Sequence, residues 1–199
     1  MELSKFTADF AAGLYAADRR SPVAINQRSK ASFKPGIGPH TESAATTLIM
    51  AELALANPGL YQQYSLNVPY GNGRRKCDVC LGESPDWEWA IEIKLLRFLG
   101  DNGQPNDNIL MHILSPYPEH RSALTDCEKL LASGLAGRKA ILVYGFQSET
   151  WPLEPAIEAF ETLANSRVSL STRCQAEFSG LVHPVHSHGK VFAWQIQPR

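Results

Sequence analysis

Two consecutive stretches of alternating hydrophobicity, residues 75–81 and 87–96, restrict the fold more than any other part of the sequence. Alternation with period two is typical of β-strands, in which successive side chains point to opposite faces. The residues between the two stretches, Gly-Glu-Ser-Pro-Asp, have the composition of a turn. The sequence therefore predicts a β-hairpin.

The two predicted strands each have one apolar face. In the second strand we expect the core face to carry Trp87, Trp89, Ile91, Ile93 and Leu95, and the opposite face to carry Glu88, Ala90, Glu92, Lys94 and Leu96. In the first strand the apolar face holds Cys77, Val79 and Leu81, and the other face holds Lys76, Asp78 and Cys80. Matching the apolar faces predicts that Leu81 lies opposite Trp87.

This register places three ionisable residues on one side of the hairpin. Asp78 then falls opposite Ala90 and diagonal to Glu92, about 7 Å away at the backbone, and Lys94 follows two residues later. Two carboxylates at this separation suit a hard divalent cation such as Mg²⁺, with Mn²⁺ as a substitute. The alternative is a solvated face of an amphipathic sheet, but Ala90 and Cys80 on the same face favour partial burial.

Composition limits the broad class of the protein. With 199 residues, 44% hydrophobic and 20% charged, the chain is expected to form one globular domain. The net charge of -1 gives no overall attraction to nucleic acid, so such binding requires a local patch. Basic residues do cluster, at Arg19, Arg20, Arg28, Lys30 and Lys34, and again at Arg74, Arg75 and Lys76. The sequence has no run of eighteen apolar residues and no signal-peptide pattern, and its four cysteines are compatible with reduced thiols, so we expect a cytoplasmic protein.

The remaining elements place the hairpin in an α/β fold. Helical periodicity predicts helices over 4–18, 41–56 (capped by Thr41), 119–132 and 153–164, and strands are expected at 64–68, 139–146, 168–178 and 190–197. The core, about 41–146, thus has the order α-β-β-β-α-β, with a helix and a basic loop before it (1–40) and an elaboration after it (147–199). The strand at 139–146 is expected to lie parallel to that at 87–96, joined by the 119–132 crossover.

The spacing Asp78-x(13)-Glu92-x-Lys94 and this element order resemble the PD-(D/E)XK nuclease superfamily, the restriction-endonuclease-like fold. The resemblance implies a central mixed sheet flanked by helices, Mg²⁺ held by Asp78 and Glu92, and Lys94 serving the attacking water. It also suggests Glu42 as a further acidic residue of the site and a homodimer as one oligomeric state. Cys77 stands where the family name has proline, which is not a ligand.

The helix at 119–132 lacks the Gln-x-x-x-Tyr pattern of the exonuclease branch of that superfamily and carries Asp126 and Lys129 instead. These two residues could lie at the edge of the site, but we interpret them as a local ion pair on the exposed side of the helix. Three histidines, His183, His186 and His188, are interpreted as solvated residues of a turn rather than metal ligands.

The sequence predicts a Mg²⁺-dependent nuclease acting on phosphodiester bonds, with DNA as the expected substrate. One alternative is a binding module for nucleic acid or protein that keeps the fold without catalysis. Another is a structural protein with zinc on Cys77, Cys80 and the histidines. The absence of Gly-x-Ser-x-Gly disfavours a serine hydrolase.

Overall fold

A computed structural model describes residues 1–71 and 75–199 of the chain. The helices are α1 (Leu3–Arg19), α2 (Glu42–Ala56), α3 (Pro58–Tyr61), α4 (Met111–Leu114), α5 (Ala123–Ala132) and α6 (Glu154–Asn165), with a 3-10 turn, η1, at Pro118–His120. The strands are β1 (Tyr64–Pro69), β2 (Lys76–Leu81), β3 (Trp87–Arg97), β4 (Ala136–Phe146), β5 (Ser169–Leu170), β6 (Cys174–Ser179) and β7 (His188–Gln197).

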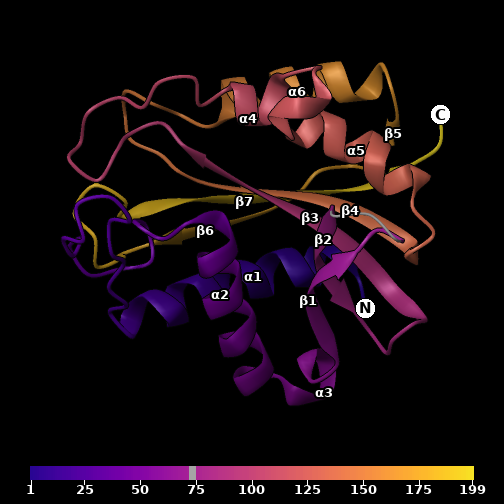
Figure 1. Cartoon of the computed structure of the whole chain (residues 1–199), viewed down its shortest axis with the longest axis horizontal. Helices are drawn as coiled ribbons and strands as arrows, with labels where there is room; N and C mark the ends of the chain where they lie inside the picture. Colours follow the sequence, from indigo (N-terminus) through magenta and orange to yellow (C-terminus); the bar gives the residue numbers. More distant parts are fainter. Residues whose placement is uncertain (72–74) are drawn as a thin grey trace.

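All of these strands belong to one mixed, open sheet with helices on both faces (Figure 1). The strand order is β1-β2-β3-β4-β7-β5, and β6 also pairs with β7. The β3 and β4 strands are parallel and are joined through α5, as predicted, whereas every other pair is antiparallel. The predicted α/β class with a helix-flanked mixed sheet is therefore confirmed. The described part of the chain has no helix with the length and apolar content needed to cross a membrane.

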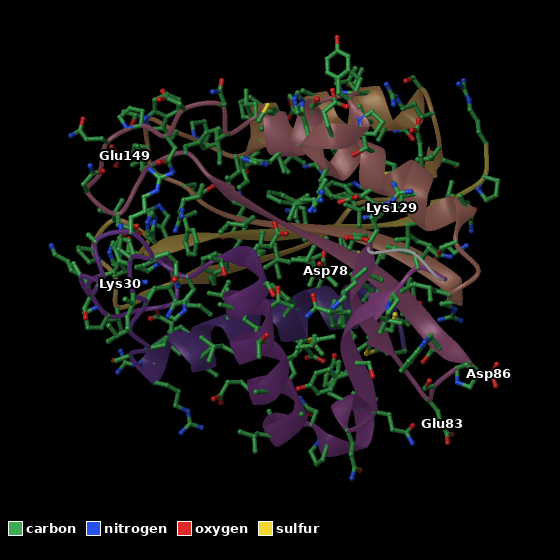
Figure 2. The ribbon with its side chains drawn as sticks, in the orientation of Figure 1. Lys30, Asp78, Glu83, Asp86, Lys129 and Glu149 are labelled. Carbon is green, nitrogen blue, oxygen red and sulfur yellow. The ribbon has the colours of Figure 1, made fainter. Side chains whose placement is uncertain are left out.

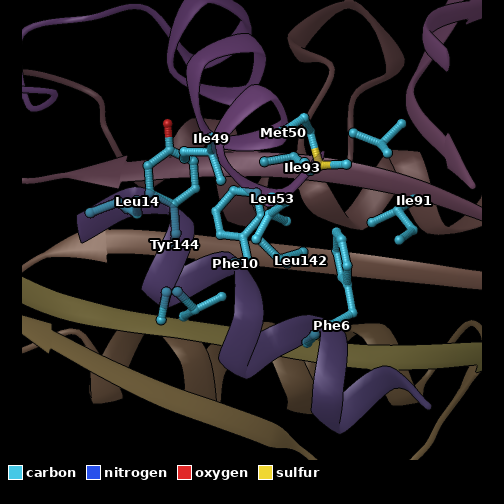
Figure 3. Close-up of a cluster of buried hydrophobic side chains, with 14 of the residues drawn as sticks. Phe6, Phe10, Leu14, Ile49, Met50, Leu53, Ile91, Ile93, Leu142 and Tyr144 are labelled. Atoms are coloured by element: carbon cyan, nitrogen blue, oxygen red, sulfur yellow. The ribbon is translucent and has the colours of Figure 1, made fainter. Parts of the chain in front are cut away.

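Two hydrophobic cores, one on each face of the sheet, hold the helices in place. On one face α1 and α2 cover the core residues of β2, β3 and β4 (Figure 3). There Gly13 lets the two helices approach closely, because a Cβ at that position would lie 2.9 Å from Leu53 Cδ2. On the other face α4, α5 and α6 cover Ala90, Leu96 and their neighbours. Because β3 is buried on both faces, the polar residues of its second face lie beneath α5.

Most predicted boundaries agree with the structure to within a few residues, and the Thr41 cap of α2 is confirmed by a hydrogen bond from Ala44 N to Thr41 Oγ1. The crossover helix α5 starts at Ala123 instead of residue 119, because Arg121 adopts a left-handed conformation (φ 49°) and Ser122 is the cap. The single strand predicted over 168–178 is divided into β5 and β6. Residues 171–173 lie opposite only residues 194–195 of β7, so one extra residue interrupts the pairing.

The predicted register of the hairpin is wrong by two residues. Leu81 pairs with Trp89 rather than with Trp87, and Cys80 pairs with Ala90. The turn is longer than expected. Gly82 (φ 104°) packs against the Glu88 backbone, and a Cβ at position 82 would lie 2.9 Å from Glu88 N. A shift of two residues leaves the faces of β3 unchanged.

The predicted alternation also fails within β2. Val79 and Leu81 lie in the core under α1 and α2, but Cys77 lies with Cys80 in the core under α5. The break falls at Asp78, whose carboxylate accepts a hydrogen bond from the β3 backbone. In β1, the residue opposite Asp78 is Asn67, which has a left-handed conformation (φ 56°). As a result β2 pairs with β3 only from Val79 to Leu81.

Candidate active site

A cavity of about 600 Å³ opens between α2, β2, β3 and α5, and the structure brings all four predicted site residues to it. Figure 2 shows Asp78 at the sheet and Lys129 on α5. Five acidic residues line the cavity: Glu42, Asp78, Glu92, Asp126 and Glu128. Five basic residues line it as well: Arg75, Lys76, Lys94, Arg121 and Lys129. Charged side chains thus make up most of the cavity lining.

Strand β3 supplies two buried residues of the cavity, Glu92 and Lys94. Its alternation sends Ile91 and Ile93 to the core under α1 and α2, and sends Glu92 and Lys94 toward α5. Glu92 is only 2% exposed and Lys94 only 8% exposed. The alternative of a solvated face is therefore wrong for these residues, and the burial expected for this face is confirmed, because α5 covers it.

Asp78 and Glu42 are fixed by the backbone of β3 on either side of Lys94. The Ile93 amide donates to Asp78 Oδ2 at 2.8 Å, and the Leu95 amide donates to Glu42 Oε2 at 2.7 Å. These amides lie beyond the last pairing of β2 with β3, so the carboxylates take the place of strand carbonyls. Burial raises the pKa of both carboxyl groups, although Lys94 opposes this shift.

Lys94 lies between carboxylates from two helices. Its ammonium is 2.7 Å from Asp126 Oδ2 and 3.7 Å from Glu42 Oε1. Burial by itself would lower the pKa of Lys94, but the surrounding carboxylates outweigh burial and raise the pKa above its ordinary value. Lys94 is therefore a fixed and protonated cation at the floor of the cavity.

Glu92 has a strongly perturbed carboxyl group. One oxygen, Oε1, accepts a hydrogen bond from the Tyr70 hydroxyl and lies 2.8 Å from the Lys129 ammonium. Burial first, and then the neighbouring carboxylates of Asp78 and Asp126, raise the pKa of Glu92 to about 8, while Lys129 acts in the opposite direction. Neighbouring carboxylates that raise the pKa of one of them in this way are typical of catalytic and binding sites.

The interpretation of Asp126 and Lys129 as an exposed ion pair is wrong. Asp126 is 3% exposed and contacts Lys94 as well as Lys129, whose ammonium is 2.6 Å from Asp126 Oδ1. The predicted parallel crossover could have identified both residues as part of the site. A helix joining β3 to β4 must cover one face of β3, so polar residues of its first turns meet polar residues of that face. Tyr70, the first residue after β1, belongs to no periodic pattern that could have identified it.

The two basic clusters noted in the sequence differ in their position relative to the cavity. Arg75 and Lys76 of the second cluster lie at the cavity, whereas Arg74 lies outside the described residues. The early cluster does not line the cavity within the described residues, and its Arg20 pairs with Glu52 of α2, with 3.0 Å between Nε and Oε1. The rim of the cavity also carries Arg121, which the sequence analysis did not single out.

The histidine turn is not solvated as predicted. His183 and His186 are 0% and 1% exposed, their rings stack at 4.8 Å, and His186 Nε2 lies 3.0 Å from Asp101 Oδ1. The turn is buried by the loop at 21–40, because Gly36 and Gly38 pack directly against the two histidines. The buried carboxylate of Asp18 joins both segments, accepting from the amides of Ile37 and Val182 at 2.8 and 2.6 Å.

The buried cysteines offer little to a zinc ion. Cys77 and Cys80 are both fully buried, and a hydrogen bond with Cys80 together with burial raises the pKa of the Cys77 thiol, which favours the protonated form. Within residues 1–71 and 75–199 no group of three or more His, Cys, Asp or Glu side chains has the spacing to hold a metal ion.

The buried charges of the cavity do fit a divalent cation. Four carboxyl groups, those of Glu42, Asp78, Glu92 and Asp126, lie around two ammonium groups, those of Lys94 and Lys129, and outnumber them. The donors are all oxygen atoms, the type that Mg²⁺ and Mn²⁺ prefer. The two lysines lie between the carboxylates, which keeps the carboxylates from converging in this structure.

Comparison of the chain with protein-family models, with curated proteins and with solved structures found no match.

Proposed function

We propose that this chain is a divalent-metal-dependent nuclease that hydrolyses phosphodiester bonds in DNA. The observation that carries the proposal is that Asp78, Glu92 and Lys94 line one cavity together with the carboxyl groups of Glu42 and Asp126. Carboxylate oxygens are ligands that divalent cations such as Mg²⁺ prefer. Exposed Arg75, Lys76 and Arg121 at its rim are suited to phosphate groups.

The order of elements supports the same proposal. Helix α2, strands β1 to β3, helix α5 and strand β4 follow one another as in the restriction-endonuclease-like fold, and β3 and β4 are parallel neighbours. Asp78 comes from the second of these strands, and Glu92 and Lys94 come from the third. We therefore assign the chain to the PD-(D/E)XK type as part of the proposal.

In the proposed reaction Asp78 and Glu92 hold the metal ion, and Glu42 completes the acidic wall beside Lys94. When bound, Mg²⁺ neutralises phosphate charge and makes water a better nucleophile at neutral pH. Because the pKa of Lys94 is raised, its side chain stays protonated and acts as a donor rather than as a base. It orients the attacking water and offsets negative charge that develops on the phosphorus oxygens. Asp126 and Glu42 hold the ammonium in place for this role.

The direct test is to incubate the purified protein with supercoiled plasmid and either Mg²⁺, Mn²⁺ or EDTA. We expect nicked or linear products with either metal and intact plasmid with EDTA. Glu92→Gln, which removes the charge and keeps the size of the side chain, should abolish cleavage. Cleavage that survives both EDTA and Glu92→Gln would disprove the proposal.

A second candidate, a non-catalytic binding module, is favoured by one observation. Lys94 and Lys129 each contact two carboxylates, so the buried network is largely satisfied without a metal ion. A binding module of this kind would retain duplex DNA equally well in Mg²⁺ and in EDTA and would leave it uncut. The plasmid experiment with a parallel gel-shift measurement distinguishes the two.

A further inference from the structure

We propose that Lys129 is an exchanging counter-ion of the site: it holds Glu92 in the absence of a divalent cation and turns to a substrate phosphate once a cation is bound. This inference rests on the proposed function. It adds a substrate-binding residue and an order of events, in which the metal ion must bind before Lys129 becomes available to the phosphate.

The contacts of Glu92 are the first reason. The Lys129 ammonium lies 2.8 Å from Glu92 Oε1, and the same oxygen accepts the Tyr70 hydroxyl. That oxygen is therefore already covered by two donors, one of them a full positive charge. A divalent cation that uses the Glu92 carboxylate competes with Lys129 for it and repels the ammonium.

The second reason is the difference between the two lysines of the cavity. Lys94 projects from a central strand and is held between Asp126 and Glu42. Lys129 projects from α5, and its ammonium contacts Asp126 at 2.6 Å in addition to Glu92. When Lys129 leaves Glu92 it can keep Asp126 as a tether, because only its own flexible side chain has to rotate.

The third reason is the space on the outer side of Lys129. A neighbouring cavity of about 590 Å³ has Tyr70, Arg75 and Lys129 among its lining residues, and both Arg75 and Lys129 line the two cavities in common. An ammonium that moves away from Glu92 in this direction enters a cavity that the exposed Arg75 also lines. Two cations in proximity repel each other unless an anion lies between them, and a phosphodiester supplies that anion.

The test compares wild type, Lys129→Met and Lys129→Gln in two measurements. Calorimetric titration with Ca²⁺, which takes oxygen ligands of the same kind, gives the metal affinity without activity as a readout. Fluorescence anisotropy with a short phosphorothioate DNA duplex gives substrate affinity, measured with saturating Ca²⁺ and with EDTA. Lys129→Gln keeps a donor near Glu92 in case Lys129→Met does not fold, and thermal melts verify both variants.

Removing the competing ammonium should tighten Ca²⁺ binding by roughly tenfold, within the range usual for coupling between two binding events. With Ca²⁺ present both variants should bind the duplex about tenfold more weakly than wild type, since a phosphate contact is lost. With EDTA they should bind it as wild type does, because Lys129 is then occupied by Glu92. The loss of DNA affinity should thus appear only when metal is bound.

Lys5→Met is the matched control, since it removes a lysine from another helical ion pair, Lys5 with Asp9 (2.8 Å), outside the cavity. An unchanged or weaker Ca²⁺ affinity in the Lys129 variants, or an equal loss of DNA affinity with Ca²⁺ and with EDTA, would overturn the inference. If wild type neither binds Ca²⁺ nor cuts plasmid, the proposed function itself fails. If wild type does both and Lys129→Met behaves as Lys5→Met does, only the exchange of partners is disproved.

Discussion

The carboxylate of Asp126 lies 2.7 Å from the ammonium of Lys94, and this ion pair joins helix α5 to the central strand β3 beneath it. Both side chains are almost fully buried. The ion pair therefore contributes to the stability of the protein. It also holds in place the Lys94 ammonium, which we assign to catalysis.

Asp126→Asn should destabilise the metal-free protein by about 3 kcal/mol, because breaking a buried ion pair leaves an uncompensated charge. Urea denaturation in EDTA measures this difference. Glu128→Gln is the control on the same helix, because Glu128 is exposed and pairs with Arg167 at 3.0 Å, so its loss should cost at most about 1 kcal/mol. Equal costs for the two substitutions would show that Asp126 is not a structural partner of Lys94.

Asp78→Asn should leave the metal-free protein as stable as wild type or more stable. The amide oxygen of asparagine can still accept from the Ile93 amide, and repulsion with Glu92 disappears. A divalent cation that binds only the folded protein raises its melting temperature by mass action, and most of this increase should vanish in the variant. Thermal melts with EDTA and with millimolar Mg²⁺ or Mn²⁺ measure both effects. Equal metal-induced shifts in variant and wild type would exclude Asp78 as a ligand.

Metal affinity should increase with pH up to about pH 8. In the folded protein the pKa of Glu92 is raised to about 8 from an ordinary value of 4.5. Below about pH 4.5 the carboxyl group is protonated in both folded and unfolded states. Between there and about pH 8 only the unfolded state loses the proton, so metal-free stability declines as the pH rises. A metal ion must displace this proton, so its affinity should increase by up to about tenfold per pH unit in that range. Calorimetric titrations at about pH 6 and pH 8 test this, and equal affinities would contradict it.

Asp18→Asn should destabilise the protein without changing the metal response. The two carboxylate oxygens of Asp18 accept from different amides, Ile37 and Val182, and asparagine has only one oxygen. Leaving one buried amide unpaired costs about 1–3 kcal/mol. Urea denaturation gives the loss, and hydrogen exchange of the Ile37 and Val182 amides should become faster. Protection that is unchanged at both amides would show that the segments are held together by other contacts.

The strands and helices of the core could be predicted because local patterns determine them. Period-two alternation identified β3 and its two faces from Trp89 onward, whereas Trp87 packs with the opposite core. Breakers and the Thr41 cap identified α2. Glu92 and Lys94 followed directly from that alternation. The break at Asp78 could not be predicted in this way, because it depends on free amides of a different strand.

The rest of the candidate site depends on tertiary structure. Asp126 and Lys129 have an ordinary spacing for an exposed helix, and only the position of α5 over β3 makes them part of the cavity. The burial of His183 and His186 likewise depends on the glycines of a loop more than 140 residues earlier in the sequence. A single-sequence pattern contains no information on such contacts.

The pairing of β2 with β3 ends at Val79 and Ile91, which leaves the following amides of β3 to the side chains of the cavity. Asp78 and Glu42 each accept a hydrogen bond from an amide of β3, so neither carboxylate can rotate away without leaving that amide unpaired. These two walls of the cavity are thus preorganised by the folding of the sheet and require no ligand to assemble them. Reorganisation on binding is then limited to the side chains that contact no backbone group, which keeps the entropic cost of capturing a ligand small.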